Sequence, residues 1–548
     1  MNLKLRSDIS PLDDTQEIFR KILASRGIHP REQSRFLNPP FPSLKQLIQS
    51  LGLKKSVLSQ AKKLILSTIA RGEAICIYGD YDADGITSTA ILWQALSLLN
   101  AKVLPFIPNR AIHGYGMSIS ALDQIMSNSA FSHSPTPKLP FNPTLFITTD
   151  NGIVAHKEIT HLKSLGKQVI VTDHHQEDPS LPEADVIVHT KLTSASGIAW
   201  TIALFLLDEA VARKYIDLAT IGIVADQIPL VGVNRDIVFH GLKSLEKTSN
   251  VGLQELYRIS GLEAKNLSPS DINFTIAPRI NAMGRLSDPL EALRLICTRS
   301  RAHASKLAEN IEQTNQLRQE MTDSAIKEAK LGINNHKVTI VASDSFHEGV
   351  VGLIAGKLAE ESGKPALAIS LLGSKAKGSA RSIKGVNITD LLKKHKDILT
   401  SVGGHAMAAG FSLNSDDLDT FVSRMYLLAD TTIDASLLVK STIVDGELSF
   451  SQINRELYTN LLQLEPFGIG NPKPRFLARR VSILDSRYVG KNRAHLKMTL
   501  EQDSITFDSV WFRAGVIPTG TSSVIFSLDL NVWNGKESIQ LLTTAFGE

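Results

Sequence analysis

Acidic and histidine side chains recur in the first half of the chain, each time after or within an apolar run. They are Asp80, Asp82, Asp84, Asp150, His174, His175 and Asp226. Carboxylates with a minority of imidazoles and no thiolate suit Mn²⁺ or Mg²⁺ better than structural zinc. Without cations, so many carboxylates in one place would repel one another and raise one another's pKa. The residue types therefore predict a divalent-metal centre if the fold brings them together.

Alternating strands and helices must position these side chains. Strand patterns are predicted at 74–79, 102–107, 145–149, 168–172 and 186–189, and helical patterns at 86–99, 155–165 and 196–212. This alternation predicts an α/β domain with a doubly wound parallel sheet. Neighbouring strands of such a sheet present their carboxyl ends at one edge, where ligands bind. We expect all the acidic segments to meet there at strand ends, including the apolar run 217–230 that carries Asp226.

Each segment also has a simpler interpretation. A lone Asp-x-Asp-Gly is more often a turn than a metal site, and a His-His pair is more often a surface feature or a helix start. Asp226 alone could cap a helix. The coincidence of four such segments favours the metal centre.

The same segments resemble the signature motifs of the DHH phosphoesterase superfamily, and in particular its RecJ branch. The motifs are GDYDADGITSTA (79–90), TDNGI (149–153), VTDHH (171–175) and GIVADQIPL (222–230), the last followed by Asn234-Arg235. The resemblance implies phosphodiester hydrolysis with two bound ions, Mn²⁺ or Mg²⁺, that share Asp150.

The resemblance also implies how the remaining ligands divide between the two ions. Asp82, together with Asp80, is implied to hold one ion. Asp84, His174 and Asp226 are implied to hold the other.

Two further positions complete the implied site. His175 is expected to face the scissile phosphate rather than a metal. Many superfamily members have a histidine four residues before the equivalent of Asp82, but here that position is Tyr78. This departure leaves the first ligand set in question, and Asp80 is the expected substitute.

Candidate phosphate-binding residues lie in glycine-containing segments. They are Arg110 in 108–116, Arg279 in 277–286, Ser379 and Arg381 in 377–385, and His405 in 401–411. Solvated arginines and ordinary tight turns are the alternative interpretation. The resemblance implies that Arg110, Ser379 and Arg381 bind a 5′-terminal phosphate, and that Arg279 and His405 contact the strand or its phosphates.

The C-terminal part combines basic charge with aromatic rings. Residues 471–497 carry eight Lys or Arg and one acid, Asp485. The nearby aromatic residues are Phe467, Phe476, Tyr488, Trp511, Phe512 and Trp533. Short β-like runs there predict a small barrel that resembles an oligonucleotide-binding (OB) fold. We expect about half of the aromatic rings to fill the barrel core and the others to be available for stacking on bases.

The chain of 548 residues is too long for one core. We predict five parts: a helical preface (1–55), a DHH catalytic domain (56–290), a long connecting helix (291–335), a DHH-associated domain (336–432) and an OB fold (437–548). The Ser- and Pro-rich segment 127–144 is expected to be an exposed insertion.

The formal net charge of only +4 neither requires nor excludes a polyanionic binding partner such as nucleic acid. The two cysteines form no CxxC pair, which fits a reducing compartment. The polar N-terminus predicts no signal peptide, and the longest apolar run, 198–207, is too short to cross a bilayer. We expect a cytoplasmic, monomeric protein without a membrane partner.

Taken with the resemblance, these features predict a single-stranded-DNA-specific 5′→3′ exodeoxyribonuclease that releases 5′-mononucleotides. The resemblance implies a role in DNA recombination and repair beside a helicase and single-strand-binding protein. One alternative is a DHH phosphoesterase of short oligoribonucleotides or cyclic dinucleotides. Another is a non-catalytic scaffold that binds single-stranded DNA.

Overall fold

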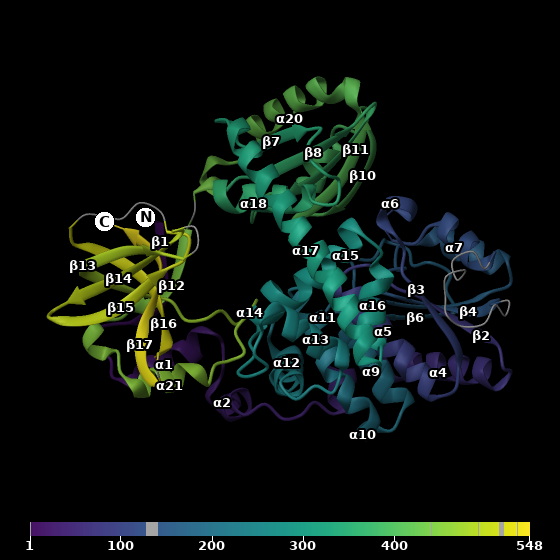
Figure 1. The fold of residues 1–548 in the computed structure, drawn as a ribbon, viewed down its shortest axis with the longest axis horizontal. Coiled ribbons are helices and arrows are strands. Elements are labelled where there is room, and N and C mark those ends of the chain that lie inside the picture. Colours follow the sequence, from purple (N-terminus) through teal and green to yellow (C-terminus); the bar gives the residue numbers. More distant parts are fainter. Residues whose placement is uncertain are drawn as a thin grey trace.

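The computed structural model describes residues 2–114, 116–127, 141–439, 441–490, 493–514, 520–533 and 535–547. Its strands form three sheets, each packed on its own apolar core, and these sheets mark three domains (Figure 1). Most of the predicted insertion 127–144 lies outside the described residues.

The first domain contains a parallel five-stranded sheet in the order β3-β2-β4-β5-β6. Its strands are β2 (Ala74–Tyr78), β3 (Lys102–Phe106), β4 (Pro143–Thr149), β5 (Gln168–Asp173) and β6 (Val186–His189). All five predicted strands are confirmed. The strand order reverses between β2 and β4, and ligands bind at such a switch point in open α/β sheets.

Helices cover both faces of this sheet, so its strands are apolar on both sides. Strand β2 shows the division, because Ile75 and Ile77 belong to one core and Cys76 and Tyr78 to the other. The first core contains residues of α5 (Ala83–Leu98) and α9 (Ala195–Leu206). The second contains residues of α7 (Ile119–Met126) and α8 (His156–Ser164).

Two predictions about secondary structure in this domain were wrong. The expected helix 196–212 divides, because Asp208 accepts a hydrogen bond from the Ala210 N–H and starts the short helix α10 (Glu209–Ala212). The run 217–230 contains no strand; it forms α11 (Ile216–Ala225), and Asp226 follows the end of this helix. Helix α11 is buried on all sides, so its sequence lacks the polar face by which an amphipathic helix is recognised.

The predicted long connecting helix is also interrupted. Residues Pro289–Cys297 form α16, and a separate helix α17 spans Arg301–Ala329. Ser300 starts the second helix by accepting a hydrogen bond from the His303 N–H, while Thr298 has an extended backbone. Helix α17 then leads from the first domain to the second (Figure 1).

The second domain is built on a mixed sheet in the order β10-β11-β9-β8-β7. The strands are β7 (Thr339–Ser343), β8 (Ala366–Leu372), β9 (Lys375–Arg381), β10 (Leu399–His405) and β11 (Ala408–Asn414). Helix α18 (Val351–Ser362) joins the parallel pair β7 and β8, and α20 (Leu418–Thr432) packs on the same domain's core. The ends of β9 and β10 carry the candidate phosphate-binding residues of this domain.

The third domain is the predicted OB-type barrel. Its strands are β13 (Phe476–Val489), β14 (His495–Gln502), β15 (Ile505–Trp511), β16 (Ser522–Trp533) and β17 (Lys536–Gly547). Strand β13 pairs with both β14 and β16, and β15 pairs with β17, which closes the sheet. The cis peptide bond between Glu465 and Pro466 precedes the barrel.

The N-terminus belongs to this third domain, which corrects the expected helical preface. Residues Asn2–Ile9 form β1, which pairs in parallel with β12 (Ser441–Glu447) beside the barrel. The helices α1 (Thr15–Ser25), α2 (Pro30–Leu37) and α3 (Leu44–Ser50) follow. Both chain ends therefore lie on the same domain in Figure 1. The partner of β1 is more than 400 residues away, so local sequence carries no signal for the pairing.

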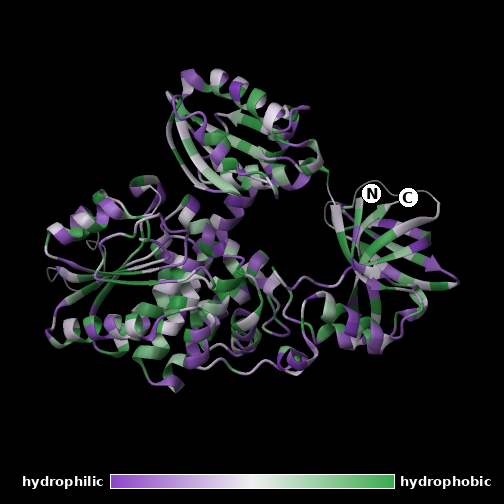
Figure 2. Cartoon of the chain, turned by 180° about the vertical axis from the view of Figure 1, so that it is seen from behind, coloured by the Kyte–Doolittle hydropathy of each residue, from purple (hydrophilic) through white to green (hydrophobic). Residues whose placement is uncertain are grey.

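Apolar residues concentrate on the strands and on the inward sides of the helices in all three domains (Figure 2). Within the described ranges, no helix combines the length and apolar character that crossing a membrane requires.

Candidate metal centre

The loop after β2 and the start of α5 place three aspartates close together. Asp82 caps α5, because its Oδ1 accepts hydrogen bonds of 3.0 Å from the N–H groups of Asp84 and Gly85. Gly85 is required by the close turn, since a Cβ there would lie 2.5 Å from the Asp80 carbonyl oxygen. Asn281 holds the same turn by accepting the N–H of Ala83 at 2.7 Å.

Asp84 is held by the start of a second helix. Its two carboxylate oxygens accept N–H groups of Ala195 and Ser196, at 2.7 and 2.9 Å, at the N-terminus of α9. The positive end of a helix dipole favours a negative charge there. The side chain is 1% exposed, so the carboxylate is fixed in position.

Asp150 and His174 come from the neighbouring strands β4 and β5. Asp150 has a left-handed backbone, with φ of 63°, and its N–H bonds to the carbonyl of Thr172. The Nε2 atom of His174 lies 3.0 Å from Asp150 Oδ1, 3.6 Å from Asp226 Oδ2 and 3.8 Å from Asp84 Oδ2.

Three groups among the described residues have ligand atoms close enough to share a metal ion, each within 4.8 Å of one another. They are Asp80, Asp82 and Asp150; Asp84, His174 and Asp226; and Asp150, His174 and His175. The first two groups contain the residues that the resemblance assigned to the two ions, and Asp150 of the first group lies 3.0 Å from His174 of the second. The structure therefore brings all seven predicted centre residues together.

The raised pKa values of two carboxyl groups in the cluster are consistent with a site that binds cations. Burial, and then the charge of Asp82, raises the pKa of Asp80 to about 8 in the metal-free protein. Burial, and then the charge of Asp84, raises the pKa of Asp226 to about 8. The buried Oδ1 of Asp80 has no hydrogen-bond partner in the structure. Buried carboxylates with unused oxygens are the donor set that Mn²⁺ and Mg²⁺ prefer.

Asp173 orients the two histidines, and this role was missed by the sequence analysis. It is 1% exposed, and its Oδ1 accepts the N–H groups of His174 and His175 at 2.7 and 3.1 Å. The same oxygen lies 2.8 Å from Nδ1 of His175. The signal was the acid directly before the His-His pair, at the end of a buried strand.

In the metal-free protein the surroundings shift the pKa values of the two histidines in opposite directions. Burial lowers the pKa of His174, so its neutral ring offers a nitrogen to a metal. Burial opposes a charge on His175 as well, but the hydrogen bond to Asp173 raises the pKa of His175 to about 9. A cationic His175 is a hydrogen-bond donor suited to a phosphoryl oxygen.

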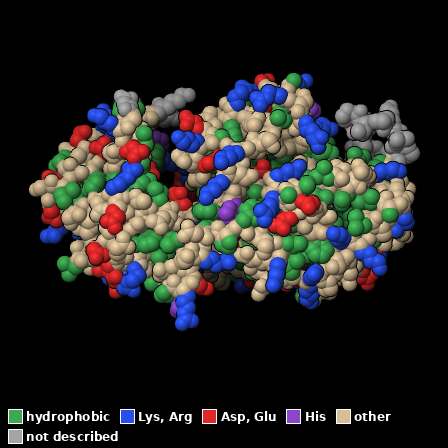
Figure 3. Space-filling model, turned by 90° about the horizontal axis from the view of Figure 1, so that it is seen from below, with side chains coloured by type: hydrophobic (Ala, Val, Ile, Leu, Met, Phe, Trp, Pro, Cys, Tyr) green, Lys and Arg blue, Asp and Glu red, His purple; other side chains and the backbone are tan. Residues whose placement is uncertain are grey.

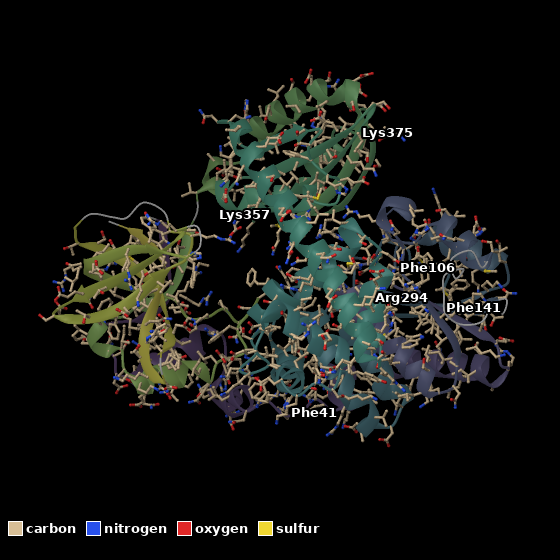
Figure 4. The ribbon with its side chains drawn as sticks, in the orientation of Figure 1. Phe41, Phe106, Phe141, Arg294, Lys357 and Lys375 are labelled. Carbon is tan, nitrogen blue, oxygen red and sulfur yellow. The ribbon has the colours of Figure 1, made fainter. Side chains whose placement is uncertain are left out.

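Tyr78, at the position where many superfamily members have histidine, does not join the centre. It is fully buried, its ring packs on Phe106, and its hydroxyl donates to the Gly116 carbonyl at 3.2 Å. Phe106, labelled in Figure 4, lies at the end of β3. Because Asp80 belongs to the first ligand group, it can take the place of the missing histidine.

Three of the candidate phosphate-binding residues converge beside the metal centre. Arg381 donates to the Ser379 hydroxyl at 3.0 Å. Burial, and then the nearby charge of Arg110, lowers the pKa of Arg381. Arg110 in turn lies over the ring of Tyr81, at 5.8 Å. A cluster of guanidinium groups is suited to bind an anion such as a phosphate.

Arg285 adds another cation to this group. Burial, and then the charge of Arg110, lowers the pKa of Arg285 to about 10. It donates to the carbonyl of Gly349 at 3.2 Å. The second domain thus meets the first at Arg285, next to the basic group.

His405 lies at the metal centre, whereas Arg279 is engaged elsewhere. The ring of His405, at the end of β10, is parallel to that of His175, with centroids 6.3 Å apart. Arg279 forms a 2.6 Å ion pair with Glu312 of α17, and both side chains are largely buried. Arg279 is therefore paired with an acid, Glu312, in this structure.

The aromatic residues of the barrel divide as expected. Phe476 is fully buried, and Phe467 and Trp511 pack against the same core. Tyr488, Phe512 and Trp533 are 46%, 59% and 72% exposed. The exposed rings are available to stack on bases.

Three family models match the chain. Residues 74–223 match the DHH family, N-terminal domain, residues 335–429 match the DHHA1 domain, and residues 444–545 match the RecJ OB domain. Each match falls on one of the three sheets described above.

Full-length relatives are similar to the chain. It is 35% identical over 542 residues to the single-stranded-DNA-specific exonuclease RecJ of Bacillus subtilis, covering 95% of this chain and 66% of that protein. It is 30% identical over 588 residues to the RecJ of Salmonella typhimurium, covering 98% and 96%. The crystal structure of Thermus thermophilus RecJ in complex with Mn²⁺ superimposes with a TM-score of 0.81 at 28% identity, covering 100% of this chain and 79% of that chain.

Proposed function

Because the chain belongs to the RecJ family of single-stranded-DNA-specific exonucleases, we propose that it hydrolyses single-stranded DNA from the 5′ end and releases 5′-mononucleotides. The observation that carries the proposal is the pair of ligand groups that meet at Asp150. The candidate metal centre lies beside a group of basic residues, and an OB-type barrel is part of the same chain.

The two ligand groups would hold two divalent ions, either Mn²⁺ or Mg²⁺. Asp80 and Asp82 would bind one ion, Asp84, His174 and Asp226 would bind the other, and Asp150 would contact both. Bound ions would supply Lewis-acid activation of water and of the phosphoryl oxygens. Solved RecJ structures from Thermus thermophilus are complexes with Mn²⁺ and with Mg²⁺, which supports both choices.

The protein side chains supply orientation and charge. Asp173 fixes the ring of His175 and favours its protonated form, so that this ring would donate to the oxygen on which charge develops during hydrolysis. His405 approaches the same space from the second domain. We propose both histidines as contacts to the scissile phosphate.

The basic residues Arg110, Arg285 and Arg381 beside the metal centre would set the direction of degradation. Arg110, Ser379 and Arg381 would bind the 5′-terminal phosphate, so the first phosphodiester bond would lie over the metal centre. A site that binds a terminal phosphate would favour a chain end over an internal phosphate of the strand. Arg279, which is paired with Glu312, would contact the strand only if that ion pair opened.

The barrel favours a polymer over a small substrate. On the face shown in Figure 3, basic and acidic side chains are intermixed, so attraction for a polyanion must arise locally. The basic segment 471–497 with the exposed Tyr488, Phe512 and Trp533 provides both charge and stacking surfaces. A role in recombination and repair, the helicase and single-strand-binding partners, a monomeric state and a cytoplasmic location remain predictions.

A 20-nucleotide strand with a labelled 5′-phosphate tests the proposal. With Mn²⁺, the labelled product should be a mononucleotide from the first turnover, and a blunt duplex of the same sequence should be degraded far more slowly. Asp150→Ala should be inactive on both. Preference for duplex, or initial release from the 3′ end, would contradict the proposal.

The same assay separates the alternatives. Faster cleavage of cyclic dinucleotides or short oligoribonucleotides than of the 20-mer would favour a small-substrate phosphoesterase. Strand binding without metal binding or cleavage would favour a scaffold.

A further inference from the structure

Arg110 lies on a short segment outside the metal centre, residues 109–118, shortly after β3. It begins the only helix of that segment among the described residues, the four-residue α6 (Arg110–His113). A helix of a single turn is not stable by its own hydrogen bonds. The position of the Arg110 guanidinium group therefore depends on the contacts that hold this segment from outside.

His113 holds the start of the segment through both nitrogens of its ring. Its Nδ1 lies 3.0 Å from the backbone nitrogen of Asn109, and because an N–H group can only donate, Nδ1 must accept. The ring proton is then on Nε2, which donates to Oε1 of Gln124 at 2.7 Å. The backbone N–H of His113 also donates to the Asn109 carbonyl at 2.8 Å. The neutral ring of His113 thus links the residue before Arg110 to α7.

The ring of His113 also packs on the apolar core of this part of the domain. Its centroid lies 5.6 Å from that of Phe106, and the ring of Phe106 lies 5.2 Å from that of Tyr78 on the neighbouring strand β2. Phe106 and Tyr78 belong to the core that also contains Leu122 of α7. Three aromatic rings therefore form a continuous row from β2 to α6.

Tyr78 holds the other end of the segment. Its hydroxyl donates to the Gly116 carbonyl at 3.2 Å, and the side chain is fully buried. The segment is thus bound on both sides of Arg110, by His113 at its start and by Tyr78 near its end. The tyrosine at a position where many superfamily members have histidine therefore contacts the segment that carries Arg110 and no metal ligand.

We propose that His113 and Tyr78 are positioning residues for Arg110. They hold its guanidinium group where it can bind a terminal phosphate together with Ser379 and Arg381 of the second domain. The proposal rests on the proposed 5′-phosphate site and identifies the residues on which the geometry of that site depends. A misplacement of about 1 Å can cost an enzyme about 100-fold in rate. If the two residues only stabilised the fold, their loss would lower activity equally on strands with and without a terminal phosphate.

Paired substrates isolate the effect on the terminal phosphate. The measured quantity is the ratio of kcat/KM for a 5′-phosphorylated 20-mer to kcat/KM for the same strand with a 5′-hydroxyl group. Arg110→Ala should lower this ratio by about 10- to 100-fold, and His113→Leu should lower it by at least about 5-fold. His113→Asn should recover most of the ratio, because its Oδ1 can accept the Asn109 N–H in place of Nδ1.

Tyr78→Phe provides a second variant, which keeps the ring and removes only the hydroxyl group. It should lower the ratio in the same direction, also where His113→Leu fails to fold, and thermal unfolding checks the fold of each variant. His29→Leu is the matched control, because Nδ1 of His29 also accepts a backbone N–H, that of Arg31, at the start of a helix. The neighbouring Ile28 packs on the core of the third domain, so the ratio should be unchanged in this control.

A double variant completes the test. Adding His113→Leu to Arg110→Ala should lower the ratio no further, because the side chain that His113 positions is already absent. If Arg110→Ala lowers the ratio but neither His113→Leu nor Tyr78→Phe does, the proposal is overturned. If Arg110→Ala itself leaves the ratio unchanged while both strands are degraded, the 5′-phosphate site is contradicted, and the positioning proposal with it. Failure of the wild type to degrade either strand would instead contradict the exonuclease function.

Discussion

The Nε2 atom of His174 lies 3.0 Å from Oδ1 of Asp150, and the two residues directly follow different strands of the sheet, β5 and β4. This contact joins the two ligand groups, because Asp150 also lies within ligand distance of Asp80 and Asp82. Asp150 is therefore the residue whose loss should affect both ions.

We predict that Asp150→Asn raises the stability of the metal-free protein and lowers its activity with Mn²⁺. Burial, and then the charge of Asp82, raises the pKa of Asp150 well above its usual value, so its charge destabilises the metal-free protein. Asparagine tolerates the left-handed backbone at this position. At pH 8 in EDTA the variant should melt about 2–6 °C higher than the wild type, whereas kcat with Mn²⁺ should fall by at least about 10³-fold. An active variant would show that Asp150 binds no metal.

Metal binding should release protons at pH 7. The pKa values of Asp80 and Asp226 are raised to about 8 without metal, so both carboxyls are largely protonated in the metal-free protein at pH 7. Since ions bind the deprotonated groups, apparent Mn²⁺ affinity should rise as pH increases from 6 to 8 and level off above 9. Calorimetric titrations in buffers of different ionisation enthalpy give the number of protons directly. If metal binding released no proton at pH 7, the raised pKa values of Asp80 and Asp226 would be contradicted.

Asp217 provides a pH effect on stability away from the metal centre. Burial raises the pKa of Asp217 to about 6, and its carboxylate accepts bonds from the Leu218 N–H and the Thr248 hydroxyl. Because the folded-state pKa exceeds the unfolded one, the stability contribution is complete below about pH 4 and is lost as pH rises through 6. Asp217→Asn should therefore stabilise the protein by up to about 3 kcal/mol at pH 8 and by about half as much at pH 5. Thermal unfolding at both pH values measures the difference.

The pair Arg279 and Glu312 allows the structural and DNA-binding interpretations to be separated. Arg279→Gln leaves the buried Glu312 unpaired and should destabilise the protein by about 3–5 kcal/mol. Adding Glu312→Gln should recover most of that stability. If Arg279 also contacts DNA, exonuclease activity will remain low in the stable double variant. Recovery of both properties would leave Arg279 with a structural role alone.

Most residues of the candidate metal centre could be predicted because three of the four acidic segments directly follow an apolar strand in the sequence. Each of the first three acidic groups follows a strand whose apolar residues are continuous, and parallel topology then brings the strand ends together. Asp226 was expected at a strand end because the fully buried α11 has no polar face. The pairing of β1 with β12 and the ion pair of Arg279 with Glu312 depend on distant segments, so no local pattern reveals them.

The N-terminal segment makes removal of the barrel a test of the fold as well as of function. Ile18 and Ile22 of α1 are fully buried in the core of the third domain, and β1 pairs with β12. Deleting residues 437–548 alone would expose these side chains and leave β1 without its partner. We therefore expect that shortened chain to aggregate and to bind a hydrophobic dye.

Removing both ends of the third domain should give a different result. A chain of residues 38–436 lacks the exposed apolar segment, although it also loses the carbonyl groups of Phe36 and Leu464 that Arg235 contacts. It should stay soluble and bind Mn²⁺, because all the predicted ligands lie between residues 80 and 226. We expect it to cleave a 5′-phosphorylated dinucleotide at about the wild-type rate but to lose at least about tenfold in kcat/KM on a 20-mer. Equal rates on both substrates would show that the barrel takes no part in binding the strand.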